Sequence, residues 1–333
     1  MSGPAILVTG GAGFIGSNIV ARLARRGDAD IVVCDRLGDA ADGKWKNIAR
    51  HDVADLVAPE QLDAWLSGNA ARVAGVVHMG AISSTTEPDA DLIADTNFRL
   101  SKRVWDWCAA EAKPLVYASS AATYGDGALG FVDDNAFGAV LAQRPLNAYG
   151  WSKKLFDLYA LRAAARGNAP PRWSGLRFFN VYGPNEYHKG GQKSVVAHMY
   201  PKAAAGEVTR LFKSHHPDYP DGGQKRDFVY VDDCVDVAEW LLTSDKSAGV
   251  VNVGSGRART FLELAEALHI ALGSKPVVEF VDTPPDIRRN YQYFTEADLT
   301  RLRALGYDRQ FTSIEAGVGA YVREYLAQED PYV

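Results

Sequence analysis

Tyr149 and Lys153 are the residues whose types and spacing most directly suggest chemistry. They lie four residues apart in the segment 147–159, whose apolar and aromatic residues at 151, 155, 156, 158 and 159 fit one face of an amphipathic helix. Residues at this spacing are neighbours on a helix, and an ammonium beside a phenol lowers a phenol pKa that is about 10 in water. Tyr149 is therefore a candidate acid/base supported by Lys153, although a solitary Tyr-x-x-x-Lys is more often an exposed pair without a catalytic role.

A glycine-rich loop at the start of the chain is the first element that could position a cofactor near this pair. An apolar run over 5–9 leads into Gly10, Gly13 and Gly16, and apolar residues at 15, 19, 20 and 23 then follow a helical period. Small residues in such a strand-loop-helix let the backbone approach a pyrophosphate, and the helix N-terminus offers free N–H groups. The pattern predicts a dinucleotide site.

The end of the second predicted strand bears on the choice of dinucleotide. Asp35 follows the apolar run 31–34, about twenty residues after the glycine loop, where a carboxylate can bind the adenosine ribose. Arg36 and Lys44 lie close enough in sequence to accommodate a 2′-phosphate instead. If both are solvated loop charges, the cofactor is NAD; we favour NADP and keep NAD open.

Further strands at 75–78 and 114–118 alternate with helices near 59–66 and 89–111, which predicts an α/β fold of Rossmann type with a doubly wound parallel sheet. Ligands bind beyond the carboxyl ends of such strands. The loop after the first of these strands should therefore face the cofactor with Met79, Gly80, Ala81, Ile82 and Ser83. After the second, Ser120 could hold a substrate oxygen or the phenol of Tyr149, whereas Ser119 could simply cap the next turn.

Glycine and proline are dense over 179–191, directly after a strand, and this indicates a crossing into a second lobe. The chain is also longer than a usual single-core domain. We therefore predict a dinucleotide-binding domain from residues 1–178 and 227–256, and a smaller, discontinuous α/β substrate domain from 179–226 and 257–333. His188 and Lys189 are the informative side chains of the crossing.

Composition excludes several classes of protein. With 36 basic and 41 acidic residues the formal charge is −5, so the chain has no general attraction for nucleic acid or an anionic membrane. No apolar run approaches eighteen residues, and we expect a cytoplasmic protein. Its three cysteines, at 34, 108 and 234, should be buried free thiols. The adjacent pair His215 and His216 lacks a third ligand at a sensible spacing, so no metal is expected.

Several motifs resemble a known family. TGGAGFIG at 9–16, SSAATYG at 119–125 and YGWSK at 149–153 are similar to the extended short-chain dehydrogenase/reductases that act on nucleotide sugars. Within that superfamily, HMGAISSTTE at 78–87, FNVYGPNEYHKG at 179–190, KRDFVYVDD at 225–233 and YQYFTEADL at 291–299 resemble the ADP-L-glycero-D-manno-heptose 6-epimerase family. The likeness covers almost the whole chain.

The resemblance implies an isomerase of carbohydrate metabolism. Its members invert C6 of an ADP-heptose for lipopolysaccharide core assembly, with tightly held NADP and two opposed acid/base groups, and they form homo-oligomers, here a homopentamer if like the family. By motif, the two groups would be Tyr149 and Lys189, with Lys153 supporting the tyrosine and the nicotinamide ribose. Cofactor contacts would include Phe14, Ile15, Asp35, Arg36, Lys44, Asn97 and Val181. Substrate contacts would be Asn180, Gly191, His198, Phe212, Arg226 and Tyr291.

Some residues depart from the family's pattern. Met79 stands where a glutamate is usual, Asn185 where an arginine follows Gly-Pro, and Gly191 where a serine is usual, and the loop 214–224 is longer. We expect these changes to affect the substrate side more than the hydride chemistry. Another nucleotide-sugar epimerase or a dehydratase stays possible, although dehydratases usually show Asp-Glu where Tyr124 follows Thr123. A non-catalytic cofactor sensor would have lost the tyrosine or the lysine.

Overall fold

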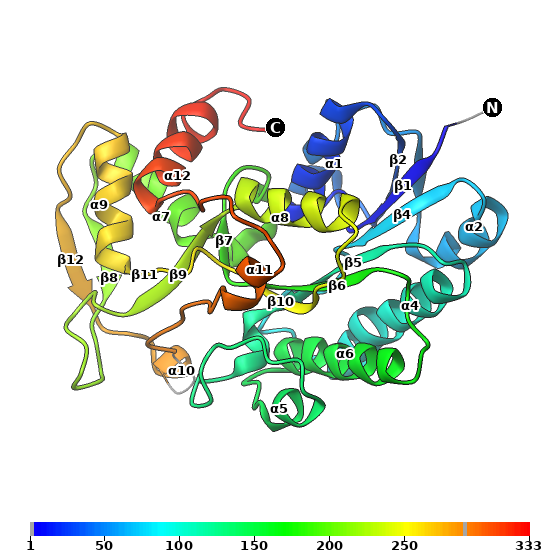
Figure 1. Cartoon of the computed structure of the whole chain (residues 1–333). Helices are drawn as coiled ribbons and strands as arrows, with labels where there is room; N and C mark the ends of the chain where they lie inside the picture. The colour runs from blue at the N-terminus through cyan, green and yellow to red at the C-terminus, as the bar shows by residue number, and fades with distance from the viewer. Residues whose placement is uncertain (1–2, 289–291) are drawn as a thin grey trace.

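The computed structural model describes residues 3–288 and 292–333. Within these ranges the larger lobe is built on a sheet of seven parallel strands in the order β10-β6-β5-β4-β1-β2-β3 (Figure 1). These strands are β1 (Ala5–Thr9), β2 (Asp30–Cys34), β3 (Asp55–Val57), β4 (Val73–His78), β5 (Leu115–Ser120), β6 (Trp173–Phe178) and β10 (Gly249–Val253). The order runs outward from β1 in both directions, so the predicted doubly wound sheet is confirmed.

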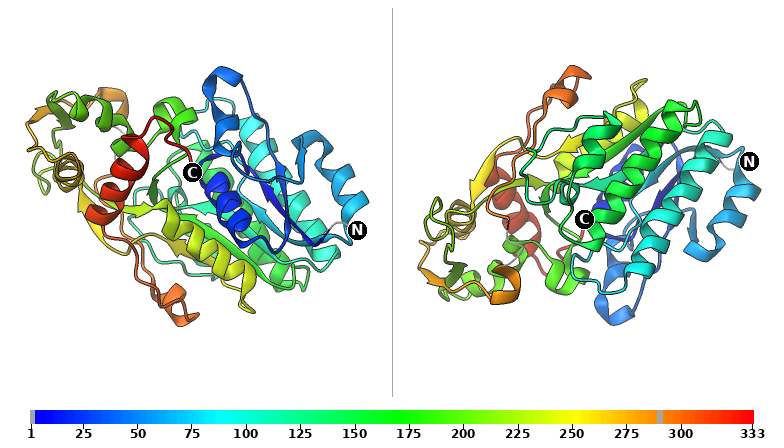
Figure 2. Two further views of the ribbon diagram at one scale, coloured as in Figure 1. Left: turned by 90° about the horizontal axis from the view of Figure 1, so that it is seen from above. Right: turned by 90° about the horizontal axis from the view of Figure 1, so that it is seen from below.

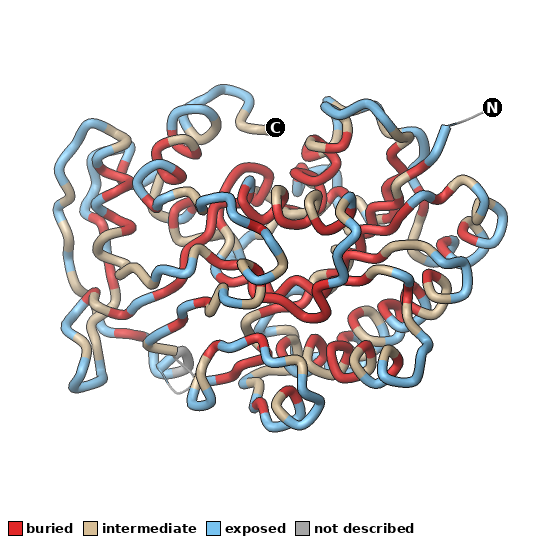
Figure 3. The backbone as a smooth tube through the Cα atoms, viewed as in Figure 1, coloured by how far each residue is buried: buried red, intermediate tan, exposed pale blue. Residues whose placement is uncertain are grey.

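Helices cover both faces of this sheet. Seen from above, α1 (Phe14–Arg26) and α8 (Val231–Thr243) lie over one face; seen from below, α4 (Leu100–Ala110) and α6 (Ala148–Ala165) lie over the other, beside α2 (Leu62–Asn69) (Figure 2). Because successive side chains of a strand point to opposite faces, Val8 packs in the core with α1 and α8, while Leu7 packs in the core with α4 and α6. Burial on both faces explains why these strands read as continuous apolar runs (Figure 3).

The smaller lobe contains two short sheets and its own core. The strands are β7 (Asn180–Tyr182), β8 (Thr209–Phe212), β9 (Lys225–Tyr230), β11 (Ala258–Thr260) and β12 (Val278–Val281), ordered β11-β9-β7 and β12-β8. Three helices pack with them, α7 (Val195–Ala204), α9 (Phe261–Ala271) and α12 (Ile314–Tyr321). The remaining short helices are α3 (Ala90–Ile93), α5 (Phe137–Ala142), α10 (Pro285–Arg288) and α11 (Thr300–Ala304).

Part of the range assigned to the substrate domain lies on the larger lobe. Leu302 in α11 and Tyr307 after it are buried in the core beneath α8, where the Tyr307 ring meets that of Trp240 at a centroid distance of 5.4 Å. The assigned domain 257–333 is therefore interrupted around 299–311. This stretch returns to the larger lobe because its apolar residues, at 299, 302, 305, 307 and 311, pack against the core beside α8.

Three expectations from composition can be compared with the structure. Cys34, Cys108 and Cys234 are buried and free, as predicted. No helix among the described residues is both long and apolar enough to cross a membrane. In the same part of the chain, no group of three or more His, Cys, Asp or Glu side chains could hold a metal ion.

Candidate active site

The carboxyl ends of β1, β4 and β5 border one cavity of about 340 Å³. It brings together four side chains from three separate parts of the sequence, those of Ser120, Tyr149, Lys153 and Lys189. Most of the predicted cofactor contacts line the same cavity, namely Gly10, Gly13, Phe14, Ile15, Gly16, Asp35, Lys44, Met79, Gly80, Ala81, Ser83 and Val181. Arg36, Ile82 and Asn97 do not line it.

The glycine loop has the shape that a dinucleotide pyrophosphate requires. A Cβ on Gly16 would lie 2.1 Å from the carbonyl oxygen of Gly10, so only glycine allows α1 to start this close to β1. Gly13 is the N-cap of α1, no side chain caps it, and the first turn carries no acidic residue. The helix N-terminus therefore presents backbone N–H groups to the cavity and has no carboxylate that would repel an anion.

Asp35 is committed to contacts within the protein. One of its oxygens accepts from the backbone N–H of Ala12 at 2.9 Å, which ties it to the glycine loop. The other accepts from the Nζ of Lys44 at 2.7 Å and from the backbone N–H of Arg36 at 2.8 Å. The guanidinium of Arg36 is exposed and pairs with Glu60. The positive charge of Lys44 thus partly neutralises that of Asp35, and both residues line the cavity.

Tyr149 enters the cavity because helix α6 approaches the end of β5 closely. A Cβ on Gly150 would lie 2.6 Å from the carbonyl oxygen of Ala122, so glycine permits this approach. The side chain of Asn147 caps the helix by accepting from the N–H of Gly150 at 2.8 Å. A hydrogen bond with Ser120 opposes the effect of burial on the pKa of Tyr149. Ser120 also caps the following turn, whereas Ser119 donates to Asp157.

Lys153 does not act on Tyr149 as the sequence predicted. Its buried Nζ donates to the carbonyl oxygen of Ala118 at 2.8 Å, and burial lowers its pKa to about 8. Burial raises the pKa of Tyr149, and the hydrogen bond with Ser120 only partly opposes this rise. The predicted lowering is therefore wrong, because desolvation of the phenol outweighs the stabilisation of its anion. A phenol with a raised pKa keeps its proton at neutral pH, so Tyr149 is a candidate proton donor.

Lys189 reaches the cavity from the other lobe, on the short 3-10 helix Tyr187–Gln192. Its ammonium lies 5.3 Å from the centre of the Phe14 ring, at the start of α1. Burial lowers its pKa, and Glu186 opposes this shift. The fully buried Glu186 holds the loop in place by accepting from the hydroxyl of Ser194 at 2.7 Å and from that of Tyr321 at 3.1 Å. An amine whose pKa is lowered in this way is a candidate to give or take a proton.

Asn97 supports the cavity from behind. It is fully buried, its Oδ1 accepts from the N–H of Ile82 at 2.8 Å, and its Nδ2 donates to the carbonyl of Ile82 and to Ser152. These contacts fix the loop 79–83 against helix α6. Asn97 and Ile82 therefore shape the lining without forming part of it.

Among the described residues, none of the predicted substrate contacts lines this cavity. His198 and Phe212 line a second cavity of about 740 Å³ in the smaller lobe, together with Lys202, Arg210 and Gln224. Gly191 is exposed, and its carbonyl oxygen lies 3.3 Å from Nε2 of His198. Asn180 accepts a hydrogen bond from the hydroxyl of Thr295. Arg226 donates to the backbone carbonyls of Lys225 and Gln292. Tyr291 lies outside the described residues.

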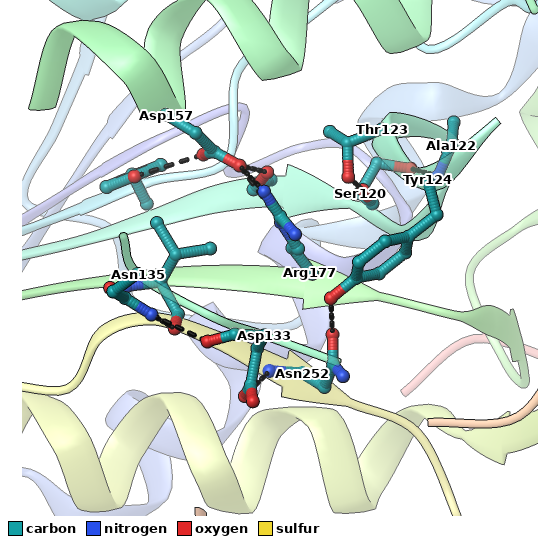
Figure 4. A network of polar contacts seen from close by, with 12 residues as sticks. Ser120, Ala122, Thr123, Tyr124, Asp133, Asn135, Asp157, Arg177 and Asn252 are labelled. Atoms are coloured by element: carbon teal, nitrogen blue, oxygen red, sulfur yellow. Dashed lines mark hydrogen bonds and ion pairs between the residues drawn. The ribbon is translucent and has the colours of Figure 1, made fainter. Parts of the chain in front are cut away.

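A buried polar network behind the site was missed in the sequence (Figure 4). Asp157 on α6 and Arg177 on β6 form a fully buried ion pair, with Nη2 and Oδ2 3.0 Å apart. Asp157 also accepts from Ser119 and Tyr117, while the Arg177 guanidinium stacks on Tyr124 at 4.7 Å. The network holds α6 against the strands that end at the cavity. It could not be predicted from the sequence, because a charged residue in a helix or a strand does not indicate which distant residue it will pair with.

Glu186 was missed in the stretch 179–190, whereas His188 and Asn185 were noticed in the sequence but were given no place at the cofactor side of the cavity. His188 lines the cavity, and burial together with the nearby Lys44 lowers its pKa to about 4. Asn185 is fully buried against the glycine-loop lobe. Its departure from the family's pattern therefore concerns the cofactor side, contrary to the expectation from the sequence.

The fold and the site together define a class of nucleotide-dependent enzyme, and the family comparison agrees. Residues 6–254 match the model of the NAD dependent epimerase/dehydratase family. The chain belongs to this family. Bound NAD in solved relatives such as the UDP-glucose 4-epimerase of Thermus thermophilus, 27% identical with a TM-score of 0.73, is consistent with a nicotinamide cofactor.

Relatives within the family narrow the class further. The chain is 48% identical over 329 residues to an ADP-L-glycero-D-manno-heptose-6-epimerase of Nitratidesulfovibrio vulgaris strain DP4, covering 98% of this chain and 99% of the relative. The solved structure of the Helicobacter pylori ADP-L-glycero-D-manno-heptose-6-epimerase is 28% identical, with a TM-score of 0.79 and coverage of 97% and 96%. The resemblance seen in the sequence motifs is confirmed.

Proposed function

We propose that this protein inverts C6 of ADP-D-glycero-manno-heptose to give ADP-L-glycero-manno-heptose, a step of lipopolysaccharide core biosynthesis. The observation that carries the proposal is that Tyr149 of one lobe and Lys189 of the other line the same cavity as the glycine loop. A cytoplasmic location and a homo-oligomeric state belong to the proposal through likeness to the family alone.

Two proton carriers are what this inversion needs. When bound, the nicotinamide would accept a hydride from C6 and return it to the other face of the resulting 6-ketone. The C6 oxygen points in different directions before and after the ketone turns, and one rigid acid cannot reach both positions. We assign Tyr149 to one pose and Lys189 to the other, with Ser120 holding the phenol and Lys153 the ribose beside it.

The proposed function is tested by asking whether turnover consumes or accumulates any nicotinamide cofactor. Because hydride leaves and returns within one turnover, the purified protein should convert ADP-D-glycero-manno-heptose without added nicotinamide and without a net change in absorbance at the wavelength of the reduced cofactor. The product is identified by its NMR spectrum. Accumulation of one reduced cofactor per product would identify a dehydrogenase and contradict the proposal.

NADP is the cofactor that we propose, and Lys44 is the residue that supports it. Asp35 is held by Lys44 and by the backbone N–H of Ala12. The positive charge of Lys44 therefore reduces the repulsion between the Asp35 carboxylate and a 2′-phosphate bound beside it. Replacing Lys44 with alanine should weaken NADP binding by about tenfold to a hundredfold, the worth of one hydrogen bond to a charged group. NAD binding should change less.

Titration of the two cofactors against protein fluorescence measures this difference. Lys102→Ala is a suitable control, because Lys102 pairs with Asp106 on α4 and does not line the cavity. An equal loss for NAD and NADP would remove Lys44 from the 2′-phosphate site.

The second cavity would hold the nucleotide end of the substrate, with Arg226 near its diphosphate. Arg226→Ala should then weaken substrate binding by roughly 1.5–3 kcal/mol. Its paired neighbour in the sheet, Arg259, provides a matched control, since it bonds to Glu263 and Glu315 within the smaller lobe. KM and melting temperature are measured for both variants; a lower melting temperature with unchanged KM would make Arg226 a structural residue.

The dehydratase alternative has no support from a specific contact. Thr123 is buried and donates to the carbonyl oxygen of Ser120 at 2.9 Å, and the next residue, Tyr124, donates to Asn252 at 2.6 Å. Both hydroxyls thus serve the buried network, and Tyr124 and Gly125 stand where a dehydratase would carry Asp-Glu.

A further inference from the structure

Asn185 joins parts of the chain that are far apart in sequence. Its side chain is fully buried, and its Nδ2 donates to the hydroxyl of Ser17 at 3.0 Å and to the carbonyl of Asn47 at 3.4 Å. Its Oδ1 accepts from the backbone N–H of Val333 at 3.1 Å. The backbone of Asn185 is left-handed, with φ of 71°, a conformation that asparagine tolerates better than most residues.

The partners of Asn185 belong to the cofactor side of the cavity. Ser17 lies in the first turn after the glycine loop, on α1. Asn47 returns a hydrogen bond to the carbonyl of Asn185 at 3.1 Å and donates to the carbonyl of Ala12 at 2.8 Å, in the glycine loop itself. Its Nδ2 also lies 3.2 Å from Nδ1 of His188. The segment 185–188 is thereby attached to the walls of the dinucleotide site.

The segment 330–333 covers the same junction. The hydroxyl of Tyr187 donates to the carbonyl of Pro331 at 3.0 Å, and its ring meets that of Tyr332 edge to face at 5.3 Å. Arg50, which follows the loop of Asn47, pairs with Asp330 and donates to the carbonyl of Tyr332 at 2.6 Å. The segment thus bridges the loop of Asn47 and the loop that carries Lys189.

We propose that Asn185 is a positioning residue, which attaches the loop of Lys189 to the glycine-loop lobe and so sets both the place of Lys189 and the retention of the cofactor. Three residues separate Asn185 from Lys189, and the first of them, Glu186, accepts hydrogen bonds from Ser194 on the far side of Lys189. Losing the amide would free the start of this loop while leaving Tyr149 on its own helix. The kinetic part of this inference rests on the proposed function; the part on cofactor retention does not.

Asn185→Gly is the direct test, because glycine keeps the left-handed backbone and removes only the amide. We expect the bound cofactor to dissociate about tenfold faster and kcat to fall about tenfold, the effect of losing one or two hydrogen bonds, with KM for the ADP-sugar nearly unchanged. Dissociation is followed by stopped-flow fluorescence of the reduced cofactor when excess NADP is added.

Asn135→Ala is the matched control. Asn135 makes three comparable hydrogen bonds, to the carbonyls of Asp133 and Val250 and from the N–H of Val250, at the edge of the large sheet. This variant should lose stability without faster cofactor release. Should Asn185→Gly fail to fold, Ser17→Ala removes one acceptor of its amide and should speed release in the same direction by a smaller factor.

Release rates in Asn185→Gly or Ser17→Ala equal to that of the unaltered protein would overturn the proposal, and so would an equal increase in Asn135→Ala. Because release is measured without any sugar, a failure of ADP-heptose to react would count against the proposed function and leave this inference standing.

Discussion

Replacing Tyr149 with phenylalanine should lower kcat by about 10²–10⁴-fold, the usual worth of a positioned proton carrier. The phenol lines the cavity beside Ser120, and burial raises its pKa, so at neutral pH it holds the proton that the C6 oxygen requires on reduction. Phenylalanine keeps the ring and its packing while removing the proton. Substrate binding should therefore change little.

Steady-state kinetics on the ADP-heptose measure this loss. Tyr159→Phe is the matched control, since Tyr159 lies on the same helix and its hydroxyl bonds to Asp106 on α4, outside the cavity. The control should keep a normal kcat. A Tyr149→Phe enzyme with more than a tenth of the normal kcat would show that another group carries the proton.

Replacing Lys189 with methionine should abolish epimerisation to a similar extent while leaving one half of the chemistry intact. Methionine preserves the length and much of the packing of the lysine stem over Phe14 but cannot carry a proton. If Tyr149 serves one pose of the ketone and Lys189 the other, the variant should still reduce a 6-aldehyde analogue in a single stereochemical sense. Tyr149→Phe should reduce it in the opposite sense.

The stereochemistry of the two products, read by NMR with a deuterium-labelled reduced cofactor, decides the assignment. Lys193→Met provides the control, because Lys193 directly follows the same short helix and does not line the cavity. Binding weakened about tenfold with nearly normal turnover in Lys189→Met would make Lys189 a substrate contact and leave Tyr149 as the proton carrier.

The sheet and the main cavity could be predicted because their signals are local in sequence. Continuous apolar strands, the glycines at 10, 13 and 16, and the spacing of Tyr149 and Lys153 each depend on short-range geometry. The loops after β4 and β5 were placed at the cavity by a general property of parallel sheets. Lys189, by contrast, was assigned by resemblance, since nothing in its neighbourhood of glycines shows that the loop folds back onto Phe14.

What could not be predicted depends on contacts between distant segments. The pairing of Asp157 with Arg177, and the return of 299–311 to the larger lobe, require the tertiary fold. The direction of the pKa shift of Tyr149 depended on how deeply the phenol is buried, a quantity that the four-residue spacing does not contain. Asn185 drew notice as a departure from a pattern, but its partners Ser17, Asn47 and Val333 come from three separate regions.

The fate of the hydrogen on C6 tests the central claim most directly. If hydride leaves C6 and returns to it without exchange, ADP-L-glycero-manno-heptose formed in D₂O should carry no solvent deuterium at C6, as measured by mass spectrometry and NMR of the purified product. One deuterium at C6 for each turnover would mean that C6 is deprotonated and reprotonated from solvent, and it would contradict the hydride mechanism that the cavity of Tyr149 and Lys189 is proposed to serve.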